Sequence, residues 1–217
     1  MPDSRTATTS STTAPTIALA WTGASGLPYG VRLLECLLAA GCRVQLLYSQ
    51  AAQVVARQEM GLELSSRPTE TAALLAERFP GLPGKLEVYG REEWFAPIAS
   101  GSNPPDAMVV CPCTMGTLAS IAQGLADNLI ERAADVALKE RRPLILVPRE
   151  TPFSVIHLEN MLRLARAGAV ILPPSPGFYQ HPQTVGDLVD FVVARILDQL
   201  RVPHQLQTRW GDERGAG

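Results

Sequence analysis

The chain has 217 residues, of which 46% are apolar and 18% charged, and its formal net charge is -2. This length suits one α/β domain and leaves little room for a second. The small net charge gives no basic field for a nucleic acid, and no apolar run is long enough to cross a bilayer, so we expect neither nucleic-acid nor membrane partners.

The first fifteen residues are rich in serine and threonine and lack the apolar core of a secretion signal. We therefore expect a flexible tail over residues 1–15 and a cytoplasmic location. A single domain is expected over residues 16–202, followed by a C-terminal extension over residues 203–217.

Short apolar runs alternate with helical patterns along the rest of the chain. The predicted strands cover residues 16–22, 42–48, 86–89, 107–111, 144–147 and 169–172. The predicted helices cover residues 30–40, 50–59, 69–79, 117–123, 128–141, 155–167 and 185–200. The strands are apolar throughout, which is typical of a parallel sheet covered on both faces. The sequence therefore predicts an α/β fold with a doubly wound, mostly parallel sheet of flavodoxin or Rossmann type.

A glycine-rich loop, TGASG, follows the first predicted strand. Gly23 and Gly26 let backbone amides approach a ligand, and Ser25 adds a hydroxyl near the positive end of a helix. The spacing is neither that of a Walker loop nor that of a dinucleotide G-x-G-x-x-G motif. After the second strand, Ser49 stands where a dinucleotide fold usually carries an acidic residue for the ribose. These features favour a mononucleotide, and a purely structural turn is the alternative.

The loop after the fourth strand, CPCTMGT, has the same character. Thr114, Gly116 and Thr117 supply hydroxyls and free amides where the next helix begins. Because ligands settle at the carboxyl ends of parallel strands, we expect this loop and the glycine loop to converge on one crevice. The alternative is that Thr114 only caps its helix.

Charged side chains follow in the next helix and strand. Arg132, Asp135 and Lys139 share one helix face, for which a solvated face with internal ion pairs is the simpler interpretation. Arg149 and Glu150 directly follow a buried strand, at the edge of the sheet where a ligand is expected. This position favours a functional site. The arginine offers a planar fork to an oxyanion, and the carboxylate could orient that fork or move a proton.

Two further candidate residues depend on context, and the sequence predicts no metal site. Tyr179 and Arg195 could bind a ligand, but a packed aromatic and a surface arginine are the alternatives. The three histidines and four cysteines show no metal-ligand spacing, so we expect buried thiols and no catalytic metal.

Four segments carry a resemblance to a known family: GASGLPYGVRLLE, CPCTMGTLASIA, NLIERAADVALKERRPLILVPRETPFSVIHLENML and GAVILPPSPGFY. From about Ile17 to Trp210 the chain resembles the UbiX-type flavin prenyltransferases. The resemblance implies a flavodoxin-like subunit that binds FMN and transfers the dimethylallyl group of dimethylallyl monophosphate to reduced FMN. The product, prenylated FMN with a fourth ring across N5 and C6, serves UbiD-type decarboxylases of ubiquinone biosynthesis or aromatic-acid breakdown. It also implies a homo-oligomer, usually a dodecamer.

The same resemblance assigns roles to individual residues. The implied FMN contacts are Gly23, Ala24, Ser25, Ser49, Thr114, Met115, Gly116, Thr117 and Arg149. The implied prenyl-phosphate contacts, partly shared between subunits, are Ser100, Gly101, Arg132, Lys139, Glu150, Tyr179 and Arg195. The implied catalytic residues are Ser25, Glu59, Trp94, Lys139 and Glu150. Among these, Trp94 is an aromatic wall near the allyl group, and Glu59 and Glu150 are candidates for proton handling.

Two other functions remain open. One is an FMN-dependent cysteine or phosphopantothenoylcysteine decarboxylase, but those enzymes share a P-x-M-N-x-x-M-W segment with a histidine before it. This chain reads TPFSVIHLENML there, with no histidine before His157. The other is a non-catalytic carrier of prenylated FMN, against which the set of Lys139, Glu150, Tyr179 and Arg195 argues.

Overall fold

The six predicted apolar runs form the strands of one sheet in the computed structural model, which describes residues 14–207. The strands are β1 (Thr16–Trp21), β2 (Arg43–Tyr48), β3 (Lys85–Tyr89), β4 (Ala107–Cys113), β5 (Leu144–Pro148) and β6 (Val170–Ile171). Their order is β3-β2-β1-β4-β5-β6, and every neighbouring pair is parallel. The predicted doubly wound α/β fold is confirmed. Most of the predicted tail and most of the predicted C-terminal extension lie outside the described residues.

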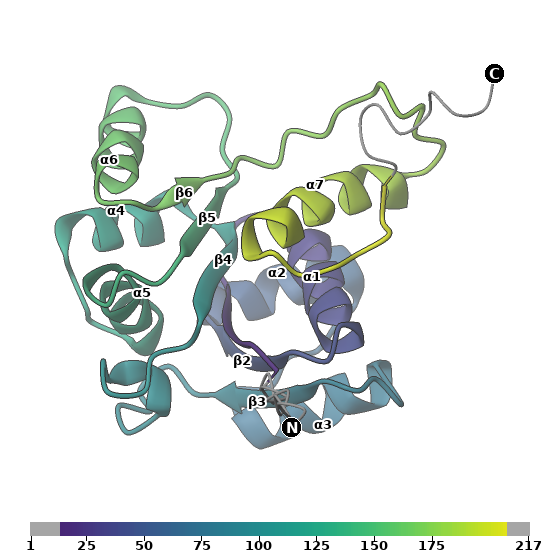
Figure 1. The fold of residues 1–217 in the computed structure, drawn as a ribbon, viewed down its shortest axis with the longest axis horizontal. Coiled ribbons are helices and arrows are strands. Elements are labelled where there is room, and N and C mark those ends of the chain that lie inside the picture. The colour runs from purple at the N-terminus through teal and green to yellow at the C-terminus, as the bar shows by residue number, and fades with distance from the viewer. Residues whose placement is uncertain (1–13, 208–217) are drawn as a thin grey trace, which may run out of the picture.

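Helices cover both faces of this sheet (Figure 1). They are α1 (Leu27–Ala39), α2 (Gln50–Met60), α3 (Pro68–Arg78), α4 (Met115–Gln123), α5 (Leu129–Lys139), α6 (Val155–Arg166) and α7 (Val185–Leu200), with a 3-10 turn, η1 (Pro97–Ala99). One apolar cluster joins α1, α2, α3 and α7 to the sheet, and a second joins α4, α5 and α6 to its other face. No helix among the described residues is long and apolar enough to span a bilayer.

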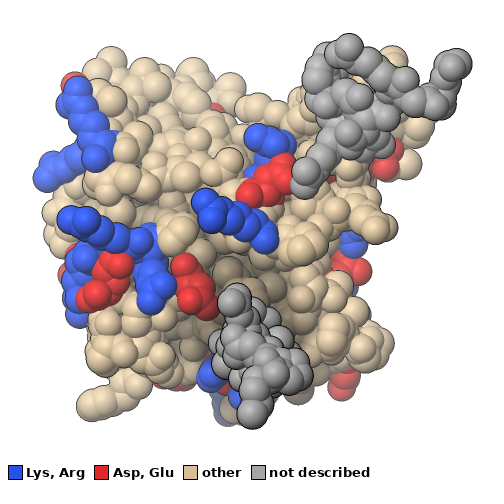
Figure 2. Space-filling model, viewed as in Figure 1, with Lys and Arg blue, Asp and Glu red and all other residues tan. Residues whose placement is uncertain are grey.

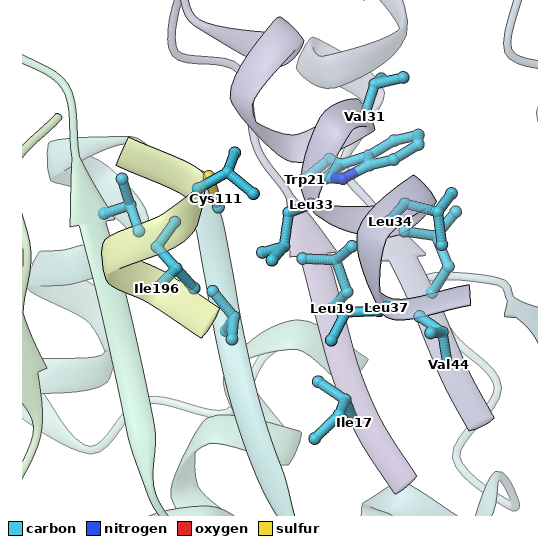
Figure 3. Close-up of a cluster of buried hydrophobic side chains, with 14 of the residues drawn as sticks. Ile17, Leu19, Trp21, Val31, Leu33, Leu34, Leu37, Val44, Cys111 and Ile196 are labelled. Carbon is cyan, nitrogen blue, oxygen red and sulfur yellow. The ribbon is translucent and has the colours of Figure 1, made fainter. Parts of the chain in front are cut away.

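The first cluster fixes where the glycine loop ends and α1 begins. Figure 3 shows side chains of β1, α1, β2, β4 and α7 meeting in it, with Trp21 fully buried. Gly30 packs so closely that a Cβ atom there would lie 2.7 Å from Trp21 Nε1 and would also meet the carbonyl oxygen of Cys111. Burying each leucine of this cluster contributes about 1.5–3 kcal/mol. The core therefore holds the start of α1 firmly against β1 and β4.

Most element boundaries agree with the sequence-based expectation within one or two residues, and three differences bear on the site or the sheet. Helix α1 starts three residues earlier than predicted, because Pro28 sits in its first turn, where a missing N–H costs little. Strand β4 runs on through Pro112 to Cys113, although proline usually ends a strand. Strand β6 is reduced to Val170–Ile171, and the turn η1 was not expected.

The cysteines are largely as expected. Cys42, Cys111 and Cys113 are buried free thiols, whereas Cys36 is partly exposed. Burial raises the pKa of Cys113 to about 12, so its thiol stays protonated at neutral pH. These thiols serve packing rather than nucleophilic chemistry.

Candidate functional site

The strand order reverses between β1 and β4, and the loops that leave the central strands meet at that point. The Thr114 amide donates to Thr22 Oγ1 at 2.8 Å, which joins the loops after β4 and β1. The Arg149 Nε–H, just after β5, donates to the Ser25 carbonyl oxygen at 3.1 Å. The Ser49 amide donates to the Trp21 carbonyl at 3.0 Å. The predicted convergence of these loops on one crevice is therefore seen in the structure.

A cavity of about 350 Å³, here called the switch-point cavity, opens between these loops. Its lining consists of Thr22, Gly23, Ser49, Gln50, Ala51, Arg91, Thr114, Thr117, Asn128, Ile130 and Glu131. The chain thus brings together several predicted FMN contacts from three separate loops.

Three helices begin at the switch-point cavity. Ser49 Oγ accepts the Ala52 amide at 3.1 Å and caps α2. Thr114 Oγ1 accepts the Thr117 amide at 3.1 Å and caps α4, so this threonine both caps a helix and lines the cavity. Asn128 caps α5 through its side-chain oxygen. Because the amino end of a helix carries partial positive charge and free amides, this arrangement suits a phosphate group.

Glycine is required where the first loop touches α2. A Cβ atom at Gly23 would collide with the Cβ of Ala51. Gly26 caps α1 with a φ of 107°, in the region that favours glycine. The glycine loop can therefore lie directly against the start of α2, on the edge of the cavity.

Glu59 has a contact that the sequence did not reveal. Its carboxylate, in the last turn of α2, accepts the amides of Gly26 at 3.0 Å and of Leu27 at 2.9 Å. The Gly26 amide, expected to face a ligand, is therefore bonded to Glu59 instead. The carboxylate caps α1 across 32 residues of sequence and fixes the glycine loop.

The charged pair after β5 is also arranged differently from expectation. The Arg149 fork is oriented by the Ser25 carbonyl rather than by its neighbour Glu150. Glu150 Oε1 instead accepts the Thr151 amide at 3.0 Å. Arg149 thus fastens the β5 loop to the glycine loop, and Glu150 stands beside that junction.

A second group of predicted residues gathers along α5, from Arg132 in its first turn to Lys139 at its last residue. Lys139 Nζ lies close to Gly101, since a Cβ atom added at Gly101 would be 2.5 Å from this nitrogen. Lys139 also forms an ion pair with Glu140. Arg132 pairs with Asp135 at 2.7 Å, as the simpler interpretation of this helix face expected. Its Nε–H also donates to the Ala99 carbonyl at 2.9 Å, next to Ser100.

Within one subunit, Lys139 is separated from the switch-point cavity. Asn128 is on the switch-point cavity, and α5 carries the chain from there to Lys139, roughly 16 Å away at 1.5 Å per residue. Figure 2 shows Lys and Arg side chains gathered over α5 and α6, with acidic side chains among them. A hollow of about 530 Å³ beside Arg141 and Arg142 also lies at this end, away from the switch-point loops.

The remaining predicted residues stand on the surface. Trp94, after β3, is 46% exposed, and Tyr179, before α7, is 51% exposed. The Tyr179 ring meets Phe191 edge to face at 5.7 Å between centroids. Arg195 on α7 pairs with Asp198 at 2.7 Å. None of these three lines the switch-point cavity of its own subunit.

Arg91, Asn128 and Glu131 line the cavity but were not predicted as site residues. Asn128 followed three residues later by Glu131 is the pattern of a helix start, which could have drawn attention to this position. Arg91 offers no such signal, because only the fold brings its carbonyl to the Leu129 amide, at 2.8 Å.

Comparison with known proteins identifies the family. A model of the Flavoprotein family matches residues 5–197. A flavin prenyltransferase UbiX from Pseudomonas aeruginosa is 57% identical over 91% of this chain and 94% of its own length. The chain belongs to the UbiX flavin prenyltransferase family. The resemblance inferred from the four sequence segments is thereby confirmed.

Solved structures of UbiX proteins share this fold. AnUbiX (PadA1), in complex with FMN and dimethylallyl pyrophosphate, has a TM-score of 0.81 and 40% identity, and the match covers 91% of this chain and 98% of that one. A dodecameric FMN-dependent UbiX-like decarboxylase from Escherichia coli O157:H7 has a TM-score of 0.78 and 43% identity, covering 90% of this chain and 98% of that one.

Proposed function

We propose that this UbiX family member binds FMN and transfers the dimethylallyl group of dimethylallyl monophosphate to N5 and C6 of reduced FMN. The observation that carries this proposal is the switch-point cavity, where three capped helices begin between the loops of β1, β2 and β4. The sequence contains no D-D-x-x-D cluster of the kind that holds magnesium in metal-dependent prenyltransferases. We therefore propose metal-independent transfer.

The residues of the cavity fit an FMN phosphate. Ser49, Thr114 and Thr117 place hydroxyl groups and helix amides around one hollow. The glycine loop continues from that hollow toward Ser25, whose carbonyl is held by Arg149. We propose that the phosphate sits in the cavity and that the flavin ring extends along Ala24 and Ser25, with Met115 and Gly116 alongside.

The donor phosphate requires residues that lie far apart in one subunit. Its departure needs donors that stabilise the developing charge, and Lys139, Tyr179 and Arg195 can supply them. Because Lys139 is at the far end of α5, we propose that the Ser100–Gly101–Lys139 group of one subunit meets Glu150 of another. Trp94 would then line the allyl pocket as an aromatic wall that favours positive charge.

Exposed apolar side chains support assembly into a homo-oligomer. The outer face of α6 exposes Val155, Ile156, Leu158 and Leu162, and Phe95 and Phe178 are exposed beside Trp94 and Tyr179. Such patches mark protein interfaces. Since the related Escherichia coli protein is dodecameric, we propose a dodecamer of this chain.

Glu150→Gln is expected to slow prenyl transfer at least about tenfold, because a neutral amide cannot accept a proton as N5 and C6 are alkylated. FMN affinity should persist, since Glu150 does not line the switch-point cavity. Stopped-flow absorbance of the reduced flavin and an FMN titration measure the two quantities. An unchanged transfer rate would remove Glu150 from the mechanism.

Single-turnover mixing tests the function itself. Protein loaded with reduced FMN is mixed with dimethylallyl monophosphate, and the molecular mass of the flavin is then measured by mass spectrometry. The transferase adds one prenyl group to the flavin. A cysteine-type decarboxylase or a non-catalytic carrier leaves the flavin mass unchanged, and that result would refute the proposal.

We also propose that a UbiD-type decarboxylase receives the product and that the protein is located in the cytoplasm.

A further inference from the structure

Arg91 stands at the switch-point cavity without an assigned role. It follows β3 in a surface loop, and its carbonyl oxygen accepts the amide of Leu129, the first residue of α5, at 2.8 Å. Its backbone is therefore fastened to one of the three helix starts that define the cavity. The residue is exposed, so its side chain has room to turn toward a ligand.

The charges around the cavity are unevenly distributed. Of the residues that line it, Arg91 is the only cation and Glu131 the only anion. Glu131 is 9% exposed, and its carboxylate accepts the Asp127 amide at 2.9 Å. Within residues 14–207, Arg91 forms no ion pair with a carboxylate, unlike Arg57, which pairs with Glu63.

The helix ends alone do not balance a phosphate monoester. Each helix start contributes roughly half a positive charge, so three supply about 1.5, of which Glu131 offsets one. A phosphate monoester carries about 1.5 to 2 negative charges at neutral pH. A guanidinium group adds one full positive charge and two parallel N–H donors that match phosphate oxygens.

We propose that Arg91 binds the phosphate of FMN and makes this site select FMN over riboflavin, which has the same ring system without the phosphate. The inference rests on the proposed FMN site and assigns a specificity-determining residue to it. An ordinary solvent-exposed arginine with no ligand is the competing explanation, and the two differ in what they predict for the two flavins.

Titration of FMN and riboflavin against the wild-type chain, Arg91→Gln and Arg91→Lys tests the proposal. Arg91→Gln should weaken FMN binding by about 10- to 100-fold, the usual range for a lost hydrogen bond to a charged group, and leave riboflavin binding unchanged. Arg91→Lys should fall between, because it keeps the charge and loses the fork. The FMN affinity of Arg91→Gln should also depend less steeply on salt.

Arg78→Gln is the matched control, since it removes the same charge from an exposed position on α3. An FMN affinity of Arg91→Gln equal to that of the control overturns the proposal and leaves the proposed function standing. Equal losses for FMN and riboflavin also overturn it, because they indicate a structural effect on the whole site. Failure of the wild-type chain to bind FMN refutes the proposed function, and the assignment of Arg91 with it.

Discussion

Lys139→Ala is expected to lower the single-turnover rate of prenyl transfer by about 10²–10³-fold, the usual effect of removing a group that stabilises developing charge. The ammonium group lies beside Gly101, where it can meet a departing phosphate. FMN affinity should stay within about twofold of wild type, because Lys139 lies an α5 length away from the switch-point cavity. Lys85→Ala, which removes an exposed lysine on β3, is the control.

Mixed oligomers test whether the site is shared. Lys139→Ala and Glu150→Gln subunits are co-expressed with different tags, and the mixed assemblies are purified. If Lys139 and Glu150 act from different subunits, random mixing restores both groups in about a quarter of the sites. If both act from the same subunit, every site lacks one of them. Activity no higher than that of the separate variants would therefore contradict the shared site.

Gly23→Ala is expected to weaken FMN binding more than about tenfold and to lower the free energy of unfolding by about 1–3 kcal/mol, the usual cost of overpacking. The added methyl group collides with the Cβ of Ala51 and so pushes the start of α2 away from the glycine loop. This displaces the Ser49 cap, which lines the cavity. FMN titration and thermal unfolding measure the two effects.

Ala51→Gly supplies the matching rescue. By itself it should cost about 0.5–1 kcal/mol, as glycine does in a helix. In the double variant, Gly23→Ala with Ala51→Gly, the colliding atom is gone, so FMN affinity should return to near the wild-type value. Failure of the double variant to recover would show that Gly23 serves the ligand directly rather than the packing of α2.

Features that follow from local pattern and chain topology were accessible from sequence. Apolar runs alternating with helical periods fixed the parallel sheet, and its carboxyl edge then had to collect Ser49, Thr114 and Arg149. The same reasoning places the start of a helix and the end of that helix at opposite edges of the sheet. The separation of Lys139 from Glu150, only eleven positions apart in sequence, is a consequence of that geometry.

Contacts made by side chains across the fold were not accessible. The reach of Glu59 to the amides of Gly26 and Leu27 depends on the angle between α1 and α2, which no local pattern encodes. The place of Arg91 depends likewise on a loop after β3 docking against α5. In both cases the contacts of a charged residue in an ordinary surface pattern come from tertiary packing alone.

Helix α5 lines the switch-point cavity with its first residues and carries Lys139 as its last, so in the proposed assembly this one helix contributes to the active sites of two subunits. A subunit released by dilution would still bind FMN but would not transfer the dimethylallyl group. Subunit association would then be required for activity, and prenyl transfer would occur only in the assembled oligomer.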